Sequence, residues 1–530
     1  MDTSANKKTN NPVNEKYLYF TVFISGMATL GFELAASRLI GPYFGVSSLV
    51  WATIIGLILI YLTIGYFLGG WIADRYPQAK VLYSLLAWGA LAAGIVPLVA
   101  SFVLRPAADA FDNFQFGLLF GSFAAVLILF TIPVTLLGTV SPFAIRLAIK
   151  DPARAGTISG RIYAISTLGS FVGTFLPDLV LIPLVGTRGT FLILSLVLLV
   201  VALVGLGLSA GRGSLLRLTW MPLLLVLLAW LNLRLPLKDT RGQIFESEST
   251  YNYIQVLELD GTRYLRLNEG QGIHSVYNPQ QIEFAGTWDH FLVAPFFNQP
   301  GYNLGEVQNI AIIGLAAGTT ARQATAVFGP IAIDGYEIDP EIIAVGRDYF
   351  GMDMSNLNAI AEDGRWGLAR SQKSYDLIGI DAYRPPYIPW HLTTVEFFQE
   401  VYDNLDSDGT LAINVGRAPE DRRLIDALVA TLEEVFPSVF VMDVPNTLNS
   451  IIYATVVPSS WANLEANYQR LGDQPEVHPL LLNSMQRALM NRQPTEPADL
   501  VFTDDRAPVE WITHSLILNF VLSGGTEDLQ

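Results

Sequence analysis

Long uninterrupted runs of apolar residues dominate the first 235 residues of the chain, and shorter alternating segments follow them. A helix needs about 20 apolar residues to cross the hydrocarbon core of a bilayer. Seven stretches reach this length: 17–40, 48–71, 80–104, 114–138, 158–183, 187–210 and 215–233. The pattern therefore predicts an α-helical transmembrane bundle of about seven spans over residues 17–235, preceded by an N-terminal tail at residues 1–16.

Several polar and small residues lie inside these apolar stretches. Glu33 and Arg38 lie in the first stretch, where ionisable groups are functional candidates, although Arg38 can equally place its head group at the membrane surface. This stretch is too long and too polar for a signal-peptide core, so we expect it to stay in the mature protein. Gly169 and Gly173 are spaced for close contact between helices.

The second half of the chain reads as a small β-unit followed by alternating strands and helices. Residues 253–259 and 264–267 alternate around the turn Asp260-Gly261, which predicts a β-hairpin within a linker and β-unit at 236–300. From residue 301 to 530, strands at 309–313 and 331–336 enclose a helix, which is typical of a Rossmann-like α/β domain with a parallel sheet.

The candidate ligand site follows the ends of these strands. Gly314 and Gly318 allow close approach of the backbone to a ligand, and Glu337 ends the next strand, where an acidic residue can bind ribose hydroxyls. Asp363-Gly364 follows a third strand. Asp381 ends a fourth strand, where a carboxylate either lies in the substrate crevice or caps a helix.

Composition removes several classes of chemistry. The net charge of −16 argues against a nucleic-acid-binding surface. The chain has no Cys, which excludes disulfides, thiolate catalysis and thiolate-bound metals. Its five His residues form no zinc motif, so we expect no metal.

Several segments together give the second half a family resemblance. They are Tyr251–Val256, Trp288–Pro295, Gly314–Thr319, Glu337–Asp339, Asp363-Gly364, Tyr375–Asp381, Leu392–Phe398 and Asp504–Glu510. With them the chain resembles membrane-fused members of the spermidine synthase (polyamine aminopropyltransferase) family. The resemblance implies a class I methyltransferase-type domain that moves an aminopropyl group from decarboxylated S-adenosylmethionine to a diamine such as putrescine.

The resemblance also implies roles for residues at matching positions. Asp381 corresponds to the catalytic base, which accepts a proton from the attacking amine, and Tyr383 would line the amine channel. The cofactor-binding set would comprise Asn252, Gly314, Gly318, Glu337, Asp339, Asp363 and Gly364. Glu337 would bind the ribose, Asp363 the adenine amino group, and Asp339 would support the loop after the second strand.

The chain departs from the family pattern where the substrates would bind. Ala317 replaces an Asp that selects the decarboxylated donor, and Arg384 replaces a second Asp after the catalytic strand. Asn252 stands for Gln, and the segment 288–290 reads Trp-Asp-His in place of Tyr-His-Glu. These changes leave the identity of the donor and of the acceptor amine open.

Two other functions remain open at this stage. Ala317 and Arg384 favour an enzyme that uses intact S-adenosylmethionine, either a methyltransferase or an aminocarboxypropyltransferase. The segment 69–75, Gly-Gly-Trp-Ile-Ala-Asp-Arg, resembles a loop of major facilitator transporters, which favours a transporter or sensor with a non-catalytic domain. The expected partners are a small amine, the lipid bilayer and a possible second copy of the chain, with no nucleic acid.

The sidedness predictions conflict. Lys and Arg gather in the loops on the amino-terminal side of the predicted spans, which places that side in the cytosol of a multi-pass inner-membrane protein. Seven spans would then put the second half outside the cytosol, where adenosyl cofactors are not expected. We therefore expect a cytosolic second half and a span count that is off by one, for example because the Pro-interrupted stretch 132–149 or the last span is not a simple crossing.

Overall fold

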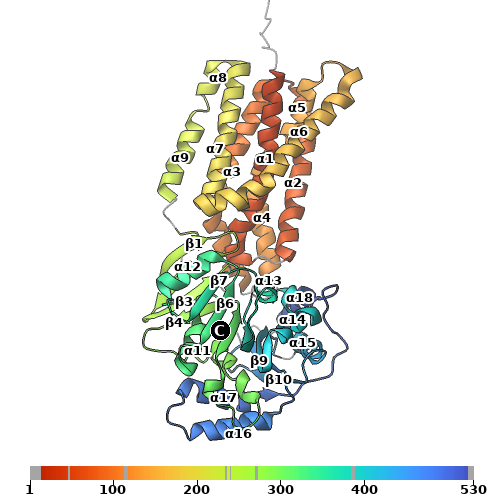
Figure 1. Cartoon of the computed structure of the whole chain (residues 1–530). Coiled ribbons are helices and arrows are strands. Elements are labelled where there is room, and N and C mark those ends of the chain that lie inside the picture. Colours follow the sequence, from red (N-terminus) through yellow and green to blue (C-terminus); the bar gives the residue numbers. More distant parts are fainter. Residues whose placement is uncertain are drawn as a thin grey trace, which may run out of the picture. The chain divides into compact units, whose positions relative to one another are not determined.

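A computed structural model shows two compact units, whose elements are labelled in Figure 1. The structure describes residues 14–45, 48–112, 117–232, 236–238, 240–268, 272–383, 388–419 and 421–522. The first unit, here called the helical unit, comprises residues 1–241, 246–253 and 268–270. The second, the α/β unit, comprises residues 242–245, 254–267 and 271–530. The domain bounds drawn from the sequence at residues 235 and 300 stay predictions.

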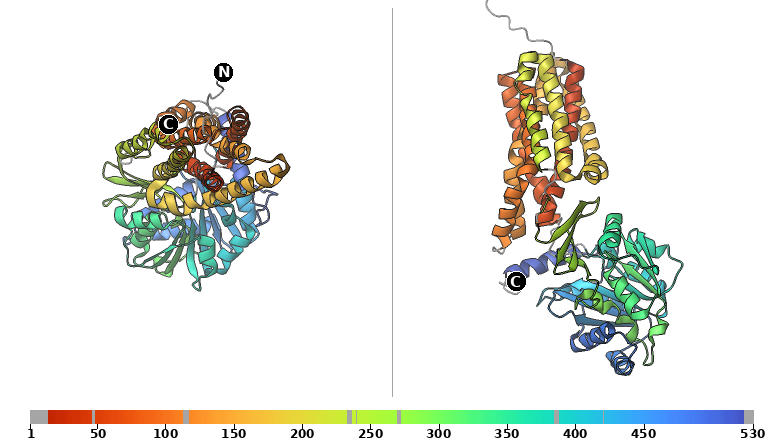
Figure 2. Two further views of the ribbon diagram at one scale, coloured as in Figure 1. Left: turned by 90° about the horizontal axis from the view of Figure 1, so that it is seen from above. Right: turned by 90° about the vertical axis from the view of Figure 1, so that its left-hand side faces the viewer.

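The helical unit consists of long apolar helices that run alongside one another (Figure 2). They are α1 (Glu15–Phe44), α2 (Ser48–Arg75), α3 (Ala79–Asp112), α4 (Gly117–Gly138), α5 (Val140–Ala148), α6 (Ala155–Leu176), α7 (Ile182–Ala210), α8 (Arg212–Leu216) and α9 (Trp220–Asn232). Helix α6 packs along α1 at two small residues: a Cβ at Gly169 would lie 2.0 Å from the carbonyl oxygen of Phe23, and one at Gly173 would lie 2.0 Å from that of Met27. The close contact predicted from this spacing is therefore present.

Six helical segments among the described residues are long and apolar enough to cross a membrane. They are Glu15–Phe44, Val50–Arg75, Ala79–Ala107, Gly121–Ala148, Pro152–Ala210 and Arg212–Leu231. The fifth has 59 residues and contains both stretches predicted at 158–183 and 187–210. The turn Pro177–Leu181 joins α6 to α7 without a break, and only Gly186, at φ 71°, leaves helical geometry. The difference from the predicted seven arises in this segment, and the number of crossings stays a prediction.

Several ionisable residues of the helical unit have partners within the protein. Arg38 Nε donates to Asp178 Oδ1 at 3.2 Å, and Arg38 Nη2 donates to the carbonyl oxygen of Thr250. Glu248 accepts a hydrogen bond of 2.8 Å from the backbone N–H of Thr187. Arg38 is thus held by a carboxylate and a carbonyl within the protein.

A four-stranded antiparallel sheet has the order β1-β2-β3-β4. Its strands are β1 (Gln243–Glu248), β2 (Tyr253–Leu259), β3 (Thr262–Leu267) and β4 (Ile273–Tyr277). The predicted hairpin is confirmed: Leu259 pairs with Thr262 across the turn, where Asp260 and Gly261 have φ of 50° and 76°. Two consecutive positive φ angles are typical of the tight turn that suits twisted strands.

The main sheet of the α/β unit has the order β12-β10-β11-β9-β8-β5-β6-β7. Its strands are β5 (Asn309–Ile313), β6 (Ala332–Glu337), β7 (Leu357–Ala361), β8 (Tyr375–Ile380), β9 (Leu405–Gly416), β10 (Ser438–Asp443), β11 (Asn449–Thr455) and β12 (Arg492–Gln493). The strands from β9 to β7 are parallel, as predicted, but β11, β10 and β12 are antiparallel. The sheet is therefore mixed, and the prediction of a parallel sheet was incomplete.

Apolar residues alternate between the two faces of this sheet. Ile310 and Ile312 of β5 belong to one core, whereas Ala311 and Ile313 belong to another. Because successive side chains of a strand point to opposite faces, this alternation means that both faces are covered. The helices of this unit are α10 (Thr287–Phe291), α11 (Thr319–Phe328), α12 (Pro340–Tyr349), α13 (Gly364–Ala369), α14 (Val395–Asp403), α15 (Arg423–Glu433), α16 (Trp461–Gly472), α17 (Pro479–Met490) and α18 (Val509–Leu522).

Candidate functional site

The carboxyl edge of the parallel strands brings most of the predicted site residues together. Strands β8, β5, β6 and β7 are neighbours, and Ile313 of β5 pairs with both Ile380 and Tyr336. The residues that follow these strands therefore meet at one edge: Gly314, Glu337, Asp363 and Asp381. Ligands bind at this edge in open α/β sheets, where the strand order reverses.

Asp381 is held in place by its backbone and by an amide. Its backbone N–H donates to the carbonyl oxygen of Ile313 at 2.8 Å. Asn414 Nδ2 donates to Asp381 Oδ1 at 2.9 Å, and Asn449 Nδ2 donates to Asn414 Oδ1 at 2.9 Å. Burial raises the pKa of Asp381 to about 7, although the bond from Asn414 acts in the opposite direction.

The turn after β5 requires two of its glycines. Gly314 and Gly318 have φ of 85° and 83°, a region that side chains disfavour. A Cβ at Gly314 would also lie 2.5 Å from the backbone of Asp381 and Ala382, and one at Gly318 would lie 2.7 Å from Met352. The turn therefore lies directly against the strand end that carries Asp381.

Glu337 accepts hydrogen bonds from two backbone N–H groups. Its Oε2 accepts from the N–H of Ala316 at 3.0 Å, and its Oε1 accepts from the N–H of Asp339 at 3.1 Å. Burial raises the pKa of Glu337 to about 7, and these two bonds oppose that effect. Each carboxylate oxygen can still accept a further hydrogen bond, since it has two lone pairs.

The next two acidic residues begin helices. Asp339 is fully buried and caps α12 by accepting from the N–H of Glu341 at 3.1 Å. Asp363 caps α13 by accepting from the N–H of Trp366 at 3.0 Å, and its other oxygen lies 3.1 Å from His391 Nε2. The hydrogen bond with His391 lowers the pKa of Asp363.

Two further predicted residues pack at the edges of this crevice. Gly364 follows Asp363, and a Cβ there would lie 2.3 Å from Ile313 Cγ2, so Gly permits close packing against β5. Burial raises the pKa of Tyr383, against a hydrogen bond with the Gly416 backbone. Arg384, singled out by the sequence, lies outside the described residues.

The other predicted positions differ in their surroundings. Asn252 belongs to the helical unit, where its Oδ1 accepts a 3.0 Å hydrogen bond from Asn268. Ala317 is 1% exposed and packs among apolar residues, and its N–H donates to Ser275 Oγ at 2.9 Å. Asp289, within the segment 288–290, is fully buried and accepts from the N–H of Ala285 at 2.7 Å.

Sequence reasoning missed the amides behind Asp381. Asn414 lies in the apolar strand β9 and donates to the Asp381 carboxylate, and Asn449 begins β11 and donates to Asn414 Oδ1. A polar side chain in an otherwise apolar strand was the available signal for Asn414, because buried polar groups need partners. Nothing in the sequence alone identified His391 as the partner of Asp363.

The site lies within a part of the chain that matches a known family model. The sequence model described as "Spermine/spermidine synthase domain" matches residues 296–465. This part of the chain is therefore similar to spermine/spermidine synthase domains. The matched residues include every predicted site residue except Asn252. The N-terminal part is helical and apolar, as the resemblance implied.

Curated relatives of this part of the chain are named as transferases. A probable polyamine aminopropyl transferase of Bifidobacterium longum is 32% identical over 50% of this chain and 61% of its own length. A polyamine aminopropyltransferase of Vibrio vulnificus is 27% identical over 44% of this chain and 77% of its own length. The chain thus spans about three fifths of the first relative and three quarters of the second.

Solved structures give a similar set of neighbours. A probable spermidine synthase from Corynebacterium glutamicum is 20% identical over 50% of this chain and 99% of that chain, with a TM-score of 0.38. A spermidine synthase from Thermotoga maritima is 19% identical over 45% of this chain and 80% of that chain, with a TM-score of 0.36.

Proposed function

We propose that the C-terminal half is a polyamine aminopropyltransferase that transfers the aminopropyl group of decarboxylated S-adenosylmethionine to a diamine such as putrescine. Asp381 carries this proposal, because it is a half-buried carboxylate with a pKa of about 7 at the carboxyl edge of the sheet. A general base is most effective when its pKa lies near the working pH.

In the proposed reaction, Asp381 accepts a proton from the amine. The nitrogen lone pair then forms a bond with the aminopropyl carbon attached to the sulfonium. The carbon–sulfur bond breaks, its electron pair stays on sulfur, and methylthioadenosine leaves. Asn414 keeps the carboxylate turned toward the amine without adding a positive charge that would lower its basicity.

The neighbouring residues hold the donor in this proposal. Glu337 accepts hydrogen bonds from the ribose hydroxyls through its free lone pairs, and Asp363 accepts one from the adenine amino group. Gly314 and Gly318 let the backbone approach the donor, and Gly364 brings α13 close to β5. Asp339 fixes the loop after β6.

Two residues take their roles in the proposal from the family resemblance. Tyr383 lines the amine channel, and Asn252 contacts the donor. Support for Tyr383 comes from its position two residues after Asp381, with its hydroxyl against Gly416. Asn252 has no comparable support.

We further propose that the helical unit is inserted in a lipid bilayer. Its helices expose large apolar side chains that water would not favour, among them Phe67, Phe102, Leu184 and Trp230 at 70% exposure or more. Lipid tails would cover these side chains. The membrane would then anchor the enzyme.

A second candidate is a transferase that uses intact S-adenosylmethionine. Ala317 favours it, because this buried apolar position offers no charge to reject the donor's carboxylate. A human eEF1A lysine and N-terminal methyltransferase is 27% identical over 28% of this chain and 23% of its own length. Asp381 favours the first candidate, since a base is needed to deprotonate an amine acceptor.

Calorimetric binding to the detergent-purified full chain separates the two candidates. The proposal predicts tighter binding of decarboxylated S-adenosylmethionine than of S-adenosylmethionine. Equal or reversed preference would support the second candidate. Absence of binding by either donor would contradict both.

A further inference from the structure

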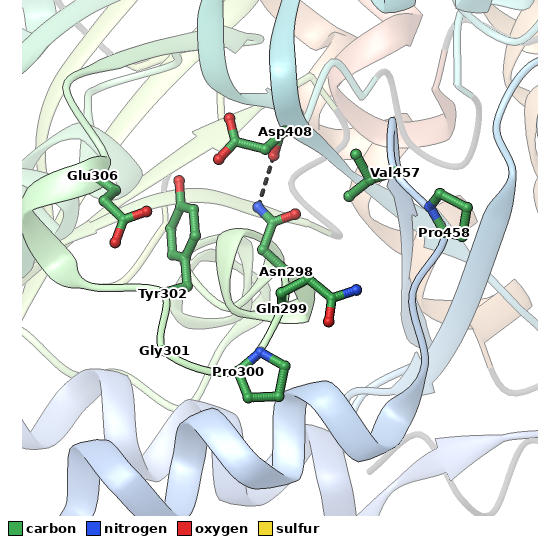
Figure 3. A pocket seen from close by; sticks show the side chains of 9 residues that line it. All are labelled: Asn298, Gln299, Pro300, Gly301, Tyr302, Glu306, Asp408, Val457 and Pro458. Carbon is green, nitrogen blue, oxygen red and sulfur yellow. Dashed lines mark hydrogen bonds between the residues drawn. The ribbon is translucent and has the colours of Figure 1, made fainter.

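The pocket drawn in Figure 3 lies at the amino edge of the parallel strands, away from the residues proposed to hold the donor. It encloses about 630 Å³, and its lining includes Asn298, Glu306 and Asp408. Glu306 precedes β5 and Asp408 lies in the first part of β9, whereas Asp363 follows the carboxyl end of β7. Recognition of the donor therefore depends on the residues around Asp363 and not on this pocket.

Two segments of the family resemblance, Leu392–Phe398 and Asp504–Glu510, have no part in the proposed reaction, yet they bind each other. Thr394 Oγ1 donates to Asp504 Oδ1 at 2.7 Å, and the backbone N–H of Asp504 donates to Glu396 Oε2 at 3.0 Å. Residues 110 positions apart in the sequence are thus joined by a hydrogen bond. The two segments therefore form one structural unit.

The side chain of Arg365 fixes this unit to the helix that follows Asp363. Arg365 lies on α13, two residues after Asp363, and its side chain is 18% exposed. Its Nη2 donates to Glu400 Oε1 at 2.7 Å and to Asp504 Oδ2 at 2.9 Å. Its Nη1 donates to Asp504 Oδ1 at 2.8 Å and to the carbonyl oxygen of His391 at 3.1 Å. Because a planar guanidinium bound to two carboxylates has a fixed geometry, it holds the backbone of His391 beside α13.

The side chain of His391 in turn binds the carboxylate of Asp363. Asp363 Oδ1 accepts from the N–H of Trp366 at 3.0 Å, and its Oδ2 lies 3.1 Å from His391 Nε2. The hydrogen bond with His391 lowers the pKa of Asp363, so the carboxylate is ionised at neutral pH and can only accept. His391 Nε2 must therefore carry the proton of this bond. With a donor on each oxygen, the carboxylate is fixed in one orientation, and each oxygen keeps one lone pair for a ligand.

Both side chains of this pair remain open to a ligand. Asp363 is 34% exposed and His391 is 33% exposed. The exocyclic amino group of adenine donates hydrogen bonds, whereas the carbonyl oxygen at the same position of hypoxanthine only accepts them. A carboxylate held in one orientation accepts from the amino group and repels the carbonyl oxygen. The pair can therefore distinguish the two bases.

We propose that His391 is a positioning residue for the purine base of the donor, because its Nε2–H holds the Asp363 carboxylate in the orientation that accepts from an exocyclic amino group. Arg365 and Asp504 hold His391 in place, which gives the two bound segments a role. This inference rests on the proposed function, in which Asp363 binds adenine. It extends that function to the residues that make the site choose an amino purine over an oxo purine.

Three variants separate orientation of the carboxylate from folding of the chain. His391→Ala removes the Nε2–H. His391→Gln supplies an amide N–H at a similar distance from the backbone and should restore the bond. The control is His478→Ala, which removes another His with a single hydrogen bond, from the N–H of Leu480 at 3.2 Å, where it caps α17.

The measurement is calorimetric binding of methylthioadenosine and of methylthioinosine to the detergent-purified full chain. We expect the parent to prefer methylthioadenosine, and His391→Ala to lose at least fivefold of this preference through weaker binding of methylthioadenosine. His391→Gln and His478→Ala should keep the preference. If His391→Ala does not fold, His391→Leu, which keeps the bulk and lacks the donor, must show the same loss.

The outcomes distinguish failure of this inference from failure of the proposed function. An unchanged preference in His391→Ala, or an equal loss of affinity for both nucleosides, would overturn the positioning role of His391 alone. A parent that binds both nucleosides equally would overturn the assignment of Asp363 to adenine, and the role of His391 with it. A parent that binds neither nucleoside would contradict the donor site as a whole.

Discussion

Asn414 Nδ2 donates a hydrogen bond of 2.9 Å to Asp381 Oδ1, so an uncharged amide holds this half-buried carboxylate. Asn449 in turn donates to Asn414 Oδ1 and fixes the orientation of that amide. A cation in the same place would lower the pKa of Asp381, whereas the amide positions the carboxylate and leaves its pKa at about 7. Asn414 of β9 thus orients the carboxylate that follows β8 without lowering its basicity.

Loss of this amide should shift the pH profile of the enzyme. Asn414→Ala removes a hydrogen bond to the ionised form of Asp381, which is worth about 1.5 to 3 kcal/mol. The pKa of Asp381 should therefore rise by about one unit, and kcat/KM should reach its plateau at correspondingly higher pH. The check is the pH dependence of kcat/KM for both proteins; a lower rate with an unchanged profile would indicate a purely structural role.

The burial of Asp381 predicts a stability that depends on pH. Its folded pKa of about 7 exceeds the ordinary value of 3.8, so the folded state holds its proton longer than the unfolded state. The contribution of Asp381 to the free energy of unfolding is therefore fully present below about pH 4. It is lost as the pH rises through 7. Asp381→Asn removes this loss, and we expect it to gain about 1 to 3 kcal/mol over the parent between these limits.

Thermal unfolding in detergent measures this effect. The apparent Tm of Asp381→Asn minus that of the parent should grow from pH 4 to pH 7 and then stay constant. A difference that does not change with pH would mean that the pKa of Asp381 is the same in the folded and in the unfolded chain.

If Glu337 binds the ribose of the donor, as proposed, a variant at this position should bind the donor less tightly. Glu337→Gln removes the charge that strengthens the proposed bonds to the hydroxyls, which should weaken donor binding by about 1 to 3 kcal/mol, or roughly ten- to a hundredfold. Calorimetry with methylthioadenosine measures this loss without turnover. The exposed variant Asp348→Asn, on α12, carries the same charge change and should bind normally. Equal affinity of the two variants would remove Glu337 from the donor site.

The long segment Pro152–Ala210 predicts the sidedness of the chain. A helix of 59 residues would be about 90 Å long, three times the hydrocarbon thickness, so we expect it to turn at Gly186 and cross twice. Seven crossings would place Ala153 and the second half of the chain on opposite sides of the membrane.

The absence of Cys makes this sidedness measurable with single substitutions. Ala153→Cys and Asp473→Cys, both at exposed positions, should both escape labelling by a membrane-impermeant maleimide in intact cells, because the second half is expected in the cytosol. Labelling of Asp473→Cys alone would indicate seven crossings and contradict a cytosolic second half.

Local sequence patterns predicted the turns and the strand ends, where the role of a residue depends on its neighbours in the chain. The Asp260-Gly261 turn, the glycines after β5 and the acidic residues at strand ends were all readable, because each depends on chain neighbours and strand order. The antiparallel strands β10 and β11 and the pairing of Asn414 with Asp381 join residues far apart in sequence. Such contacts depend on sheet register, which no local pattern specifies.

The seven predicted spans differ from the six helical segments of the structure for a related reason. Composition identifies apolar stretches but does not show where one helix ends and the next begins. The turn Pro177–Leu181 stays helical despite its Pro and Asp residues, whereas Gly186 alone departs from helical angles. Gly186 lies between the predicted stretches 158–183 and 187–210, so the apolar pattern and the backbone geometry mark the same division.

The central claim is tested most directly by the products of one reaction. Detergent-purified full chain is incubated with decarboxylated S-adenosylmethionine and putrescine, and methylthioadenosine and the aminopropylated amine are quantified by mass spectrometry. We predict equal amounts of the two products, and a rate at least a hundredfold lower in Asp381→Asn, because removal of a general base costs about 10² to 10⁴ in rate. Formation of the aminopropylated amine at an undiminished rate by Asp381→Asn, or no product from the parent with any diamine, would contradict the account.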